Sequence, residues 1–240
     1  MGEFVGRLWQ GLVHVHRDVE NTAWGGVLLG NVWPAYLFAL PLAARVWILL
    51  QTVRQLREPS LHEQALVLQE AVTVVFLALV VILFAVRRRG IRGHRATWRE
   101  GIVALLGTFL LNVVAYLPVD ATTSTGILLA SSAVVVVGTL FTIWSLATLG
   151  RCFGLLPEVR GLVLSGPYRV VRHPVYLGEA VSAVGILIAK PHPLIATLLV
   201  AFLLLQYART VFEERALAAA YPTDYPAYRE RVPRLVPGWR

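Results

Sequence analysis

Six long apolar stretches, separated by short polar connections, constrain this 240-residue chain more than any other feature of its sequence. An α-helix needs about 20 apolar residues to cross a bilayer, or somewhat fewer where arginines flank it. The stretches that meet this need lie at about 27–50, 65–86, 101–117, 126–149, 174–189 and 194–208. The chain is 57% hydrophobic and only 15% charged, which excludes a soluble domain. We therefore predict an all-α, polytopic transmembrane helix bundle with about six spans.

The last two stretches are predicted to form a helical hairpin, because only the sequence Lys-Pro-His-Pro separates them. Pro191 and Pro193 fit poorly inside a helix and so mark the turn. The tail beyond 209 is polar and rich in proline and tyrosine, and it is too short to build a core of its own. It is therefore expected to fold back on another part of the molecule.

Basic residues gather in the 87–100 and 150–172 connections and in the tail, whereas the 119–125 connection has none. By the positive-inside rule, the three basic stretches share the cytoplasmic side, and an even number of spans places both termini there. The arginine-rich sequence RRRGIRGHRATWR at 87–99 lies between two apolar segments. Anionic lipid headgroups therefore explain it better than a nucleic acid does.

The N-terminal 22 residues contain no continuous apolar core, so no cleavable signal peptide is predicted there. Spaced apolar residues from Phe4 to Val15 favour a short helix on the membrane surface. The chain has one cysteine, Cys152, and no histidine or acidic spacing typical of a metal site. We expect no metal ion and no nucleic-acid partner.

The first candidate site lies in the sequence SGPYRVVRHPVYLGE at 165–179. His173 precedes Pro174, which suits the first turn of a helix, so His173 is predicted at the N-cap, where free N–H groups favour an anion. Arg172 stands beside it, and Tyr176 and Gly178 follow within a turn, where the glycine is predicted to let a ligand approach the backbone. The site suits a carboxylate or a phosphate. The alternative is that Arg172 and His173 only anchor a helix end among the headgroups.

A second group of charged residues follows the hairpin. Arg209 and Glu213 are four residues apart, on one helical face, with Glu214 adjacent. Taken alone, they form an ordinary salt bridge at a helix end. The predicted topology, however, brings them to the same end of the hairpin as the first site, which favours a binding pocket. Glu179 lies inside an apolar span, where an ionisable group is costly and indicates function.

These pieces resemble the isoprenylcysteine carboxyl methyltransferase and phospholipid methyltransferase superfamily of integral membrane enzymes. The resemblance rests on SGPYRVVRHPVYLGE, on RTVFEERAL at 209–217, on YPAYRERVP at 225–233 and on the closing RLVP, and it covers roughly 145–237. It implies S-adenosylmethionine (SAM) as methyl donor, bound by the hairpin and by a short cytoplasmic tail that folds over the cofactor. It also implies two regions: N-terminal transmembrane helices for substrate access at 1–150, and a cofactor-binding region at 151–240.

The resemblance implies roles for individual residues. Arg172, His173 and Tyr176 hold the methionine carboxylate of the cofactor, and Glu213 or Glu214 binds its ammonium or ribose hydroxyls. Arg209 matches an arginine that, in the carboxyl methyltransferases, lies near the transferred methyl and orients a substrate carboxylate. Independently of the resemblance, an amine acceptor must lose a proton, and Glu179 or Glu214 is expected to take it. The residues expected to bind cofactor are Val171, Arg172, His173, Tyr176, Leu177, Gly178, Glu213, Glu214, Tyr225 and Tyr228, and those expected to act in catalysis are Arg209 and Glu214.

The acidic run FEER is shorter than in the eukaryotic carboxyl methyltransferases, and Lys190 is the single lysine among 22 basic residues. Such arginine-dominated usage is typical of a GC-rich bacterial genome, where prenylated proteins are uncommon. We therefore expect a bacterial inner-membrane enzyme with its site at the cytoplasmic face. Its expected partners are the lipid bilayer and a lipophilic or lipid-like acceptor that presents a carboxylate, thiol or amine.

Two other interpretations stay open at the level of sequence. One is a membrane reductase of the sterol reductase kind, which uses NADPH and has a comparable hairpin. The other is a non-catalytic membrane scaffold or transporter subunit, which predicts no cofactor.

Overall fold

The helices begin where the sequence supplies caps and prolines. The computed structural model describes residues 31–88, 90, 97–117 and 124–238. Ser60 and Thr97 form capping boxes with Glu63 and Glu100, in which each side chain accepts a backbone N–H of the other residue. The helices are α3 (Trp33–Gln55), α4 (Leu61–Val86), α5 (Trp98–Tyr116), α6 (Thr125–Leu149), α7 (Pro174–Ala189), α8 (Pro193–Ala220) and the short α9 (Asp224–Arg231).

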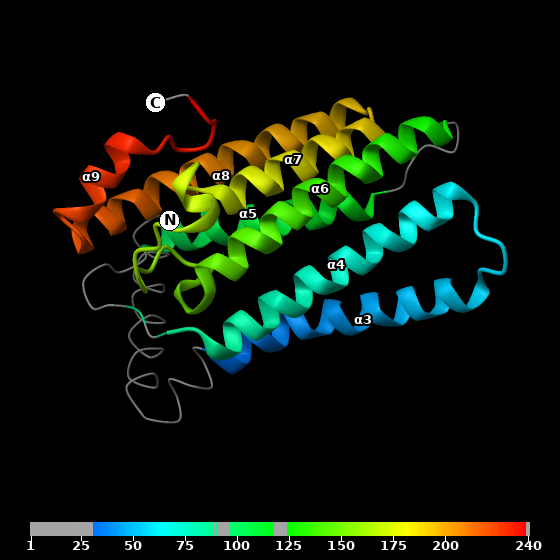
Figure 1. Cartoon of the computed structure of the whole chain (residues 1–240), viewed down its shortest axis with the longest axis horizontal. Coiled ribbons are helices and arrows are strands. Elements are labelled where there is room, and N and C mark those ends of the chain that lie inside the picture. The colour runs from blue at the N-terminus through cyan, green and yellow to red at the C-terminus, as the bar shows by residue number, and fades with distance from the viewer. Residues whose placement is uncertain (1–30, 89, 91–96, 118–123, 239–240) are drawn as a thin grey trace, which may run out of the picture.

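The six long helices run side by side in one bundle (Figure 1), which confirms the predicted all-α polytopic fold. Two 3₁₀ turns, η2 (Gly150–Cys152) and η3 (Gly166–Arg169), flank the connection between α6 and α7. α8 continues past its predicted end at 208 to Ala220, because the segment is rich in alanine, leucine, glutamate and arginine, which favour helix. The second group of charged residues therefore lies inside α8.

Four helices in the described part of the chain are long and apolar enough to cross a membrane: α3, α4, α6 continued through Cys152, and α8. The other two predicted spans fall short of this measure. α7 has 16 residues, or about 24 Å of helix against a hydrocarbon core of roughly 30 Å. α5 has 19 residues, and two of the first three, Arg99 and Glu100, are charged. Both still pack along a longer neighbour in the bundle.

Small residues bring α6 and α7 close together, so α7 packs mainly on α6, while α8 packs mainly on α5. Ser131 Oγ donates to the carbonyl of Gly185 at 2.8 Å. A Cβ at Gly185 would lie 2.9 Å from the backbone nitrogen of Val135. This close approach is typical of small residues at helix interfaces in membranes. The predicted hairpin thus forms, but its two helices are joined chiefly through their other neighbours.

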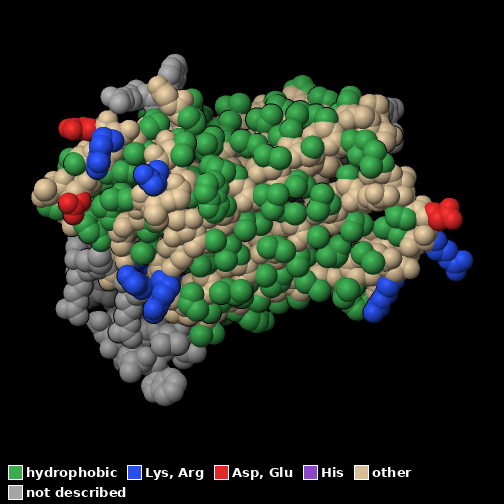
Figure 2. All heavy atoms as spheres, in the orientation of Figure 1, with side chains coloured by type: hydrophobic (Ala, Val, Ile, Leu, Met, Phe, Trp, Pro, Cys, Tyr) green, Lys and Arg blue, Asp and Glu red, His purple; other side chains and the backbone are tan. Residues whose placement is uncertain are grey.

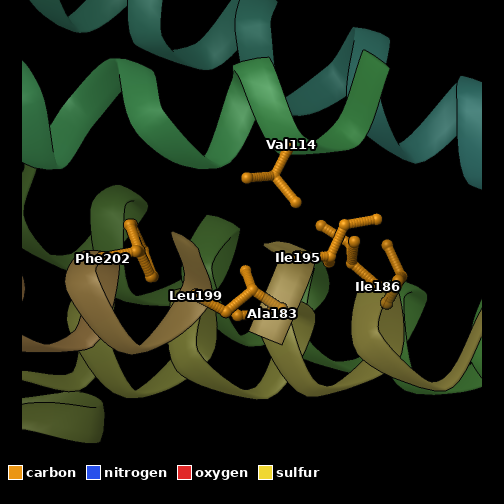
Figure 3. Close-up of a cluster of buried hydrophobic side chains, with 7 residues drawn as sticks. Val114, Ala183, Ile186, Ile195, Leu199 and Phe202 are labelled. Carbon is orange, nitrogen blue, oxygen red and sulfur yellow. The ribbon is translucent and has the colours of Figure 1, made fainter. Parts of the chain in front are cut away.

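Two apolar clusters hold the bundle together. Figure 3 shows the first, in which Val114 of α5 faces side chains of α7 and α8; its buried members are Val114, Val135, Ala183, Ile186, Ile195, Leu199 and Phe202. The second joins α3, α4 and α6 and consists of Phe38, Leu77, Val80, Leu83, Phe84 and Leu146. Each cluster ties one set of helices together, and α6 contributes to both.

Apolar side chains cover the length of the bundle, and charged side chains lie at its two ends (Figure 2). The basic stretches meet at one end, as predicted: the N–H of Arg88 donates to the carbonyl of Arg151 at 2.8 Å, and Arg160 Nε donates to that of Arg88 at 3.1 Å. The tail lies at the same end (Figure 1). The predicted surface helix near the N-terminus and most of the 119–125 connection lie outside the described residues.

Candidate functional site

His173 is the N-cap of α7, and Pro174 takes the first helical position, where no N–H is needed. Two amides just before the helix are already paired with the C-terminal tail. The N–H of Arg172 donates to the carbonyl of Pro233 at 2.9 Å, and that of His173 to the carbonyl of Arg234 at 3.1 Å. The tail therefore folds back on the start of α7, and these two amides are occupied by the chain itself.

Glu214 of α8 lies at the centre of an ionic network. Arg234 donates to it twice, from Nε to Oε1 at 3.0 Å and from Nη2 to Oε2 at 2.7 Å. Arg172 Nε and His173 Nε2 each lie 3.2 Å from Oε1. Because the Glu214 side chain is 5% exposed, these basic groups compensate a buried carboxylate. We call Glu214, Arg172, His173 and Arg234 the tail latch, since they join α8, the start of α7 and the tail.

Glu213, the neighbour of Glu214, is oriented differently. It accepts a hydrogen bond from the Tyr176 hydroxyl, and its Oε2 lies 3.6 Å from His173 Nδ1. The His173 ring stacks on that of Tyr176, with centroids 5.7 Å apart. Burial of the His173 ring lowers its pKa, but the hydrogen bonds and charges of Glu213 and Glu214 outweigh burial, so the pKa is raised above the ordinary value. His173 thus bridges two carboxylates, and both of them favour its protonated form.

Arg209 is a buried cation that bonds to neutral groups. Its Nη1 donates to Gln206 Oε1 at 3.1 Å and to Thr108 Oγ1 at 3.3 Å, and its Nη2 donates to the carbonyl of Leu155 at 3.4 Å. The guanidinium carbon lies 4.9 Å from the centre of the Tyr176 ring. Nε is buried and has no hydrogen-bond partner in the described part of the chain. Arg209 therefore keeps one donor available for a ligand.

Glu179 of α7 supplies a carboxylate that is linked to Arg209 through Gln206. It accepts a hydrogen bond from Gln206, which also accepts one from Arg209. Glu179 and Arg209 thus share a neutral amide between them. Arg209 bonds to Gln206 instead of forming the salt bridge with Glu213 that their four-residue spacing allows.

Most of these side chains border one cavity, whose empty space is about 1220 Å³ when the adjoining open solvent is included. Its polar wall consists of Arg172, His173, Tyr176, Glu179, Arg209, Glu213, Tyr225 and Tyr228. Its apolar wall comes from α3, α4, α6 and the connection after α6, and includes Phe38, Phe76, Val80, Leu146 and Phe153.

The two tail tyrosines close the polar wall in different ways. The Tyr228 hydroxyl donates to the carbonyl of Tyr168 in η3 at 2.6 Å, whereas the buried Tyr225 hydroxyl has no hydrogen-bond partner in the described part of the chain. Burial raises the pKa of Tyr228 to about 12, and it also raises that of Tyr225. Both phenols are therefore neutral at physiological pH, and that of Tyr225 is available to a ligand.

The structure brings most of the predicted site residues to this cavity, but four lie elsewhere: Val171, Leu177, Gly178 and Glu214. Val171 is fully buried. Gly178 faces α6, where a Cβ would clash with Thr142, so it permits helix packing and not the ligand approach that we predicted. Glu214 belongs to the tail latch. The binding and catalytic roles of the other residues stay predictions.

Sequence reasoning missed the connection from Cys152 to Val163, which lines the cavity opposite α8. Arg160 holds this connection in place. Its buried side chain pairs with Glu158, Nη2 to Oε2 at 2.5 Å, and its Nε donates to the carbonyl of Arg88 just after α4. Gly154 leaves space for the Arg160 guanidinium, since a Cβ there would lie 2.9 Å from its central carbon. The sequence does contain an indication of this loop, because Gly154 and Gly161 lie in the segment that leads directly into the motif at 165–179.

Comparison with known proteins agrees with the geometry. Residues 125–224 match the phospholipid methyltransferase family. The resemblance predicted from the motifs is confirmed over this region, and four of the described helices are long and apolar enough to cross a membrane. The matched region contains α6, α7 and α8, and so most of the polar wall and Glu214 of the tail latch; α3, α4 and α5 lie before it.

A 98-residue segment is also 35% identical to the cobalt-zinc-cadmium resistance protein CzcN of Cupriavidus metallidurans. The segment covers 39% of this chain and 45% of CzcN, so less than half of the length of that relative is spanned. The similarity supports a shared region and does not identify an acceptor.

Proposed function

We propose that this chain is a SAM-dependent membrane methyltransferase that methylates a lipophilic or lipid-like acceptor at a carboxylate, thiol or amine. One observation supports it above all: a single cavity joins a wall of charged groups from the family-matched region to an apolar wall from the earlier helices. A methyl donor with charged ends and an acceptor with an apolar body require these two surfaces side by side.

The polar wall fits the chemical groups of SAM. Arg172, whose side chain lines the cavity, suits its carboxylate, and Glu213 suits its ammonium group or ribose hydroxyls. The buried hydroxyl of Tyr225 has no hydrogen-bond partner among the described residues, so it remains a hydrogen-bonding group for a ligand. A buried polar group without a partner is costly, which is best explained by a ligand that completes it.

When bound, SAM supplies a methyl group on a sulfonium, which a nucleophile displaces in line. The protein's contribution is alignment and the exclusion of water. The tail latch holds the tail against α7 and α8, and Tyr225 and Tyr228 thereby close one side of the cavity.

The acceptor is expected to place its reactive group near Arg209 and Glu179. Arg209 Nε is available to orient a carboxylate. A carboxylate or thiolate acceptor is already nucleophilic, whereas an amine must first lose a proton. We assign that proton to Glu179, which lines the cavity, in preference to Glu214, which is held in the tail latch.

The remaining parts of the proposal concern location. The positive-inside rule favours the cytoplasmic face for the arginine-rich end of the bundle, where the cavity-lining connection from Cys152 to Val163 lies. The arginine-dominated usage favours a bacterial inner membrane. Residues 151–240 are proposed to bind the cofactor and residues 1–150 to admit the acceptor, since Phe38, Phe76 and Val80 of the apolar wall come from the earlier helices.

Isothermal titration of SAM, and separately of NADPH, into the detergent-purified protein tests this function. We expect SAM to bind and NADPH not to bind. Glu213→Ala should weaken SAM binding about 10- to 100-fold, because a hydrogen bond to a charged group is worth about 1.5–3 kcal/mol. Glu230→Ala, an exposed change in α9, is the matched control. Binding of NADPH alone would favour the reductase, and binding of neither would favour a scaffold.

A further inference from the structure

Gln206 of α8 joins the two charged groups that are proposed to meet the acceptor. Its Nε2 donates to Glu179 of α7, and its Oε1 accepts from Arg209 Nη1 at 3.1 Å. Gln206 is buried, with 3% of the residue exposed, and it is not among the described residues that line the cavity. Glu179 and Arg209 do line it. Gln206 therefore acts on the cavity only through these two neighbours.

The chemistry of its partners decides which way the amide of Gln206 faces. An ionised carboxylate only accepts hydrogen bonds and a guanidinium only donates them, so the NH₂ group faces Glu179 and the carbonyl faces Arg209. The reverse orientation would oppose donor to donor and acceptor to acceptor. The amide is thus held from both sides. Of the side chains of this length, glutamine offers a donor and an acceptor without a charge.

Helix α5 supplies the space for this arrangement and a further contact. Gly107 faces the pair, since a Cβ there would lie 2.9 Å from Gln206 Oε1 and 3.0 Å from Arg209 Cδ. Thr108 accepts from Arg209 Nη1 at 3.3 Å and donates its own hydroxyl to the carbonyl of Ala104 at 2.8 Å. Arg209 therefore donates from Nη1 to two neutral oxygens, and neither of them cancels its charge.

We propose that Gln206 is a positioning residue that keeps Glu179 and Arg209 from pairing with each other, so that the cavity can bind an acceptor with an anionic or a cationic end. An acid and a cation in a buried site attract each other strongly. The neutral amide takes one bond of each and leaves Arg209 Nε without a partner in the described part of the chain. That the occupant is a methyl acceptor rests on the proposed function, whereas the separation of the charges rests on these hydrogen bonds.

Cys152 allows a test that needs neither SAM nor turnover, because it is the single cysteine of the sequence and it lines the cavity. The detergent-purified, full-length protein is labelled at pH 8 with methyl methanethiosulfonate, a small neutral thiol reagent. Dodecanoate and dodecylamine serve as probes, because they share one apolar chain and carry opposite charges at this pH. The measured quantity is the concentration of each probe that halves the labelling rate of Cys152. Cys152→Ser provides the background.

Both probes should protect Cys152 in the wild type. Gln206→Glu, a change that nearly conserves shape, gives Arg209 a charged partner and opposes Glu179 with a second carboxylate. The half-protection concentration of dodecanoate should rise about tenfold relative to that of dodecylamine, because the added charge acts in opposite senses on the two probes. The matched control is Gln64→Glu, which adds the same charge at an exposed position of α4 and should leave the ratio within about twofold.

Gln206→Met is the second variant, and it tests the proposal even if Gln206→Glu misfolds. It removes both hydrogen bonds of the amide without adding a buried charge. Glu179 and Arg209 should then pair directly, so both probes should bind about fivefold more weakly, the value of roughly one hydrogen bond to each. Gln64→Met is its control and should bind both probes as the wild type does.

An equal probe ratio in Gln206→Glu and Gln64→Glu would overturn the proposal. So would unchanged binding of both probes in Gln206→Met, or a wild type that neither probe protects. The titration of SAM is a separate measurement. Failure of SAM binding with the expected probe responses would refute the methyltransferase and leave the role of Gln206 standing. Normal SAM binding without those responses would remove the role of Gln206 alone.

Discussion

Two adjacent glutamates mark two regions of the site that do different work. Glu214 is 5% exposed and lies behind the cavity in the tail latch, where Arg172, His173 and Arg234 surround it. Glu213 is 28% exposed and lines the cavity. The same short acidic motif therefore supplies a residue that holds the tail and a residue that faces a ligand. Loss of activity on mutation does not distinguish these roles, so stability and binding must be measured separately.

The largest effect is expected when the tail latch is broken. Glu214→Ala leaves several buried or half-buried basic groups without their shared carboxylate, and breaking a buried ion pair from one side costs about 3–5 kcal/mol. For a chain of this length, the Tm in detergent should fall by roughly 10 °C or more. Glu230→Ala is the matched control in the exposed part of α9. If both variants melt together, Glu214 does not hold the tail.

A cavity-wall residue should show the opposite behaviour. Arg209→Gln removes the cation that is placed to orient an acceptor, so methyl transfer from radiolabelled SAM should fall about 100-fold, a typical loss when one electrostatic group is removed. The affinity for SAM, measured by titration, should change by less than about threefold, because Arg209 is assigned to the acceptor and the contacts that bind SAM are unchanged.

Arg215→Gln, at an exposed arginine six residues further along α8, controls for the loss of charge. A parallel fall in SAM affinity and rate in Arg209→Gln would place Arg209 at the cofactor, contrary to the proposal.

His173 belongs to both regions, because it contacts Glu213 and Glu214. Its pKa is raised in the folded protein. The folded state therefore binds the proton more tightly, and this stabilisation is complete below the unfolded pKa of about 6.5 and is lost as the pH rises through the folded pKa. The Tm of the wild type should fall as the pH is raised from 6 to 9, and His173→Gln should flatten this dependence.

Thermal melting curves at each pH give the measurement, and the Tm falls by roughly 2–4 °C for each kcal/mol of lost unfolding free energy. A slope of the same size in His173→Gln would mean that other groups carry the dependence.

Sequence reasoning predicted the fold well where local signals were strong. Pro174 and Pro193 fix the starts of α7 and α8, and the basic connections meet at one end. It predicted the charged residues of the polar wall because the recognised motif contains them. It could not separate Glu213 from Glu214, since that distinction depends on Arg234, which reaches Glu214 only after the tail has folded.

The apolar wall was beyond sequence reasoning for a different reason. Phe38, Phe76 and Val80 lie in stretches that are apolar throughout, so nothing in the pattern distinguishes a side chain that faces the cavity from one that faces lipid. The role of Gly178 was misread in the same way, because a glycine serves equally for ligand approach and for helix packing until the position of α6 is known.

The smallest expected effects compare the two tail tyrosines. Tyr228→Phe removes a buried hydrogen bond to the carbonyl of Tyr168 and should destabilise the protein by about 1 kcal/mol. Tyr225→Phe removes a buried hydroxyl that has no partner in the described part of the chain, so the Tm should stay unchanged or rise slightly.

If that hydroxyl awaits SAM, Tyr225→Phe should weaken its binding about threefold to tenfold, the value of one ordinary hydrogen bond. Thermal unfolding and SAM titration of the same two preparations decide the matter. A stability loss in Tyr225→Phe equal to that in Tyr228→Phe would show that both phenols hold the tail. The difference between the tail latch and the cavity wall would then hold for Glu214 and Glu213 but not for the two tyrosines of α9.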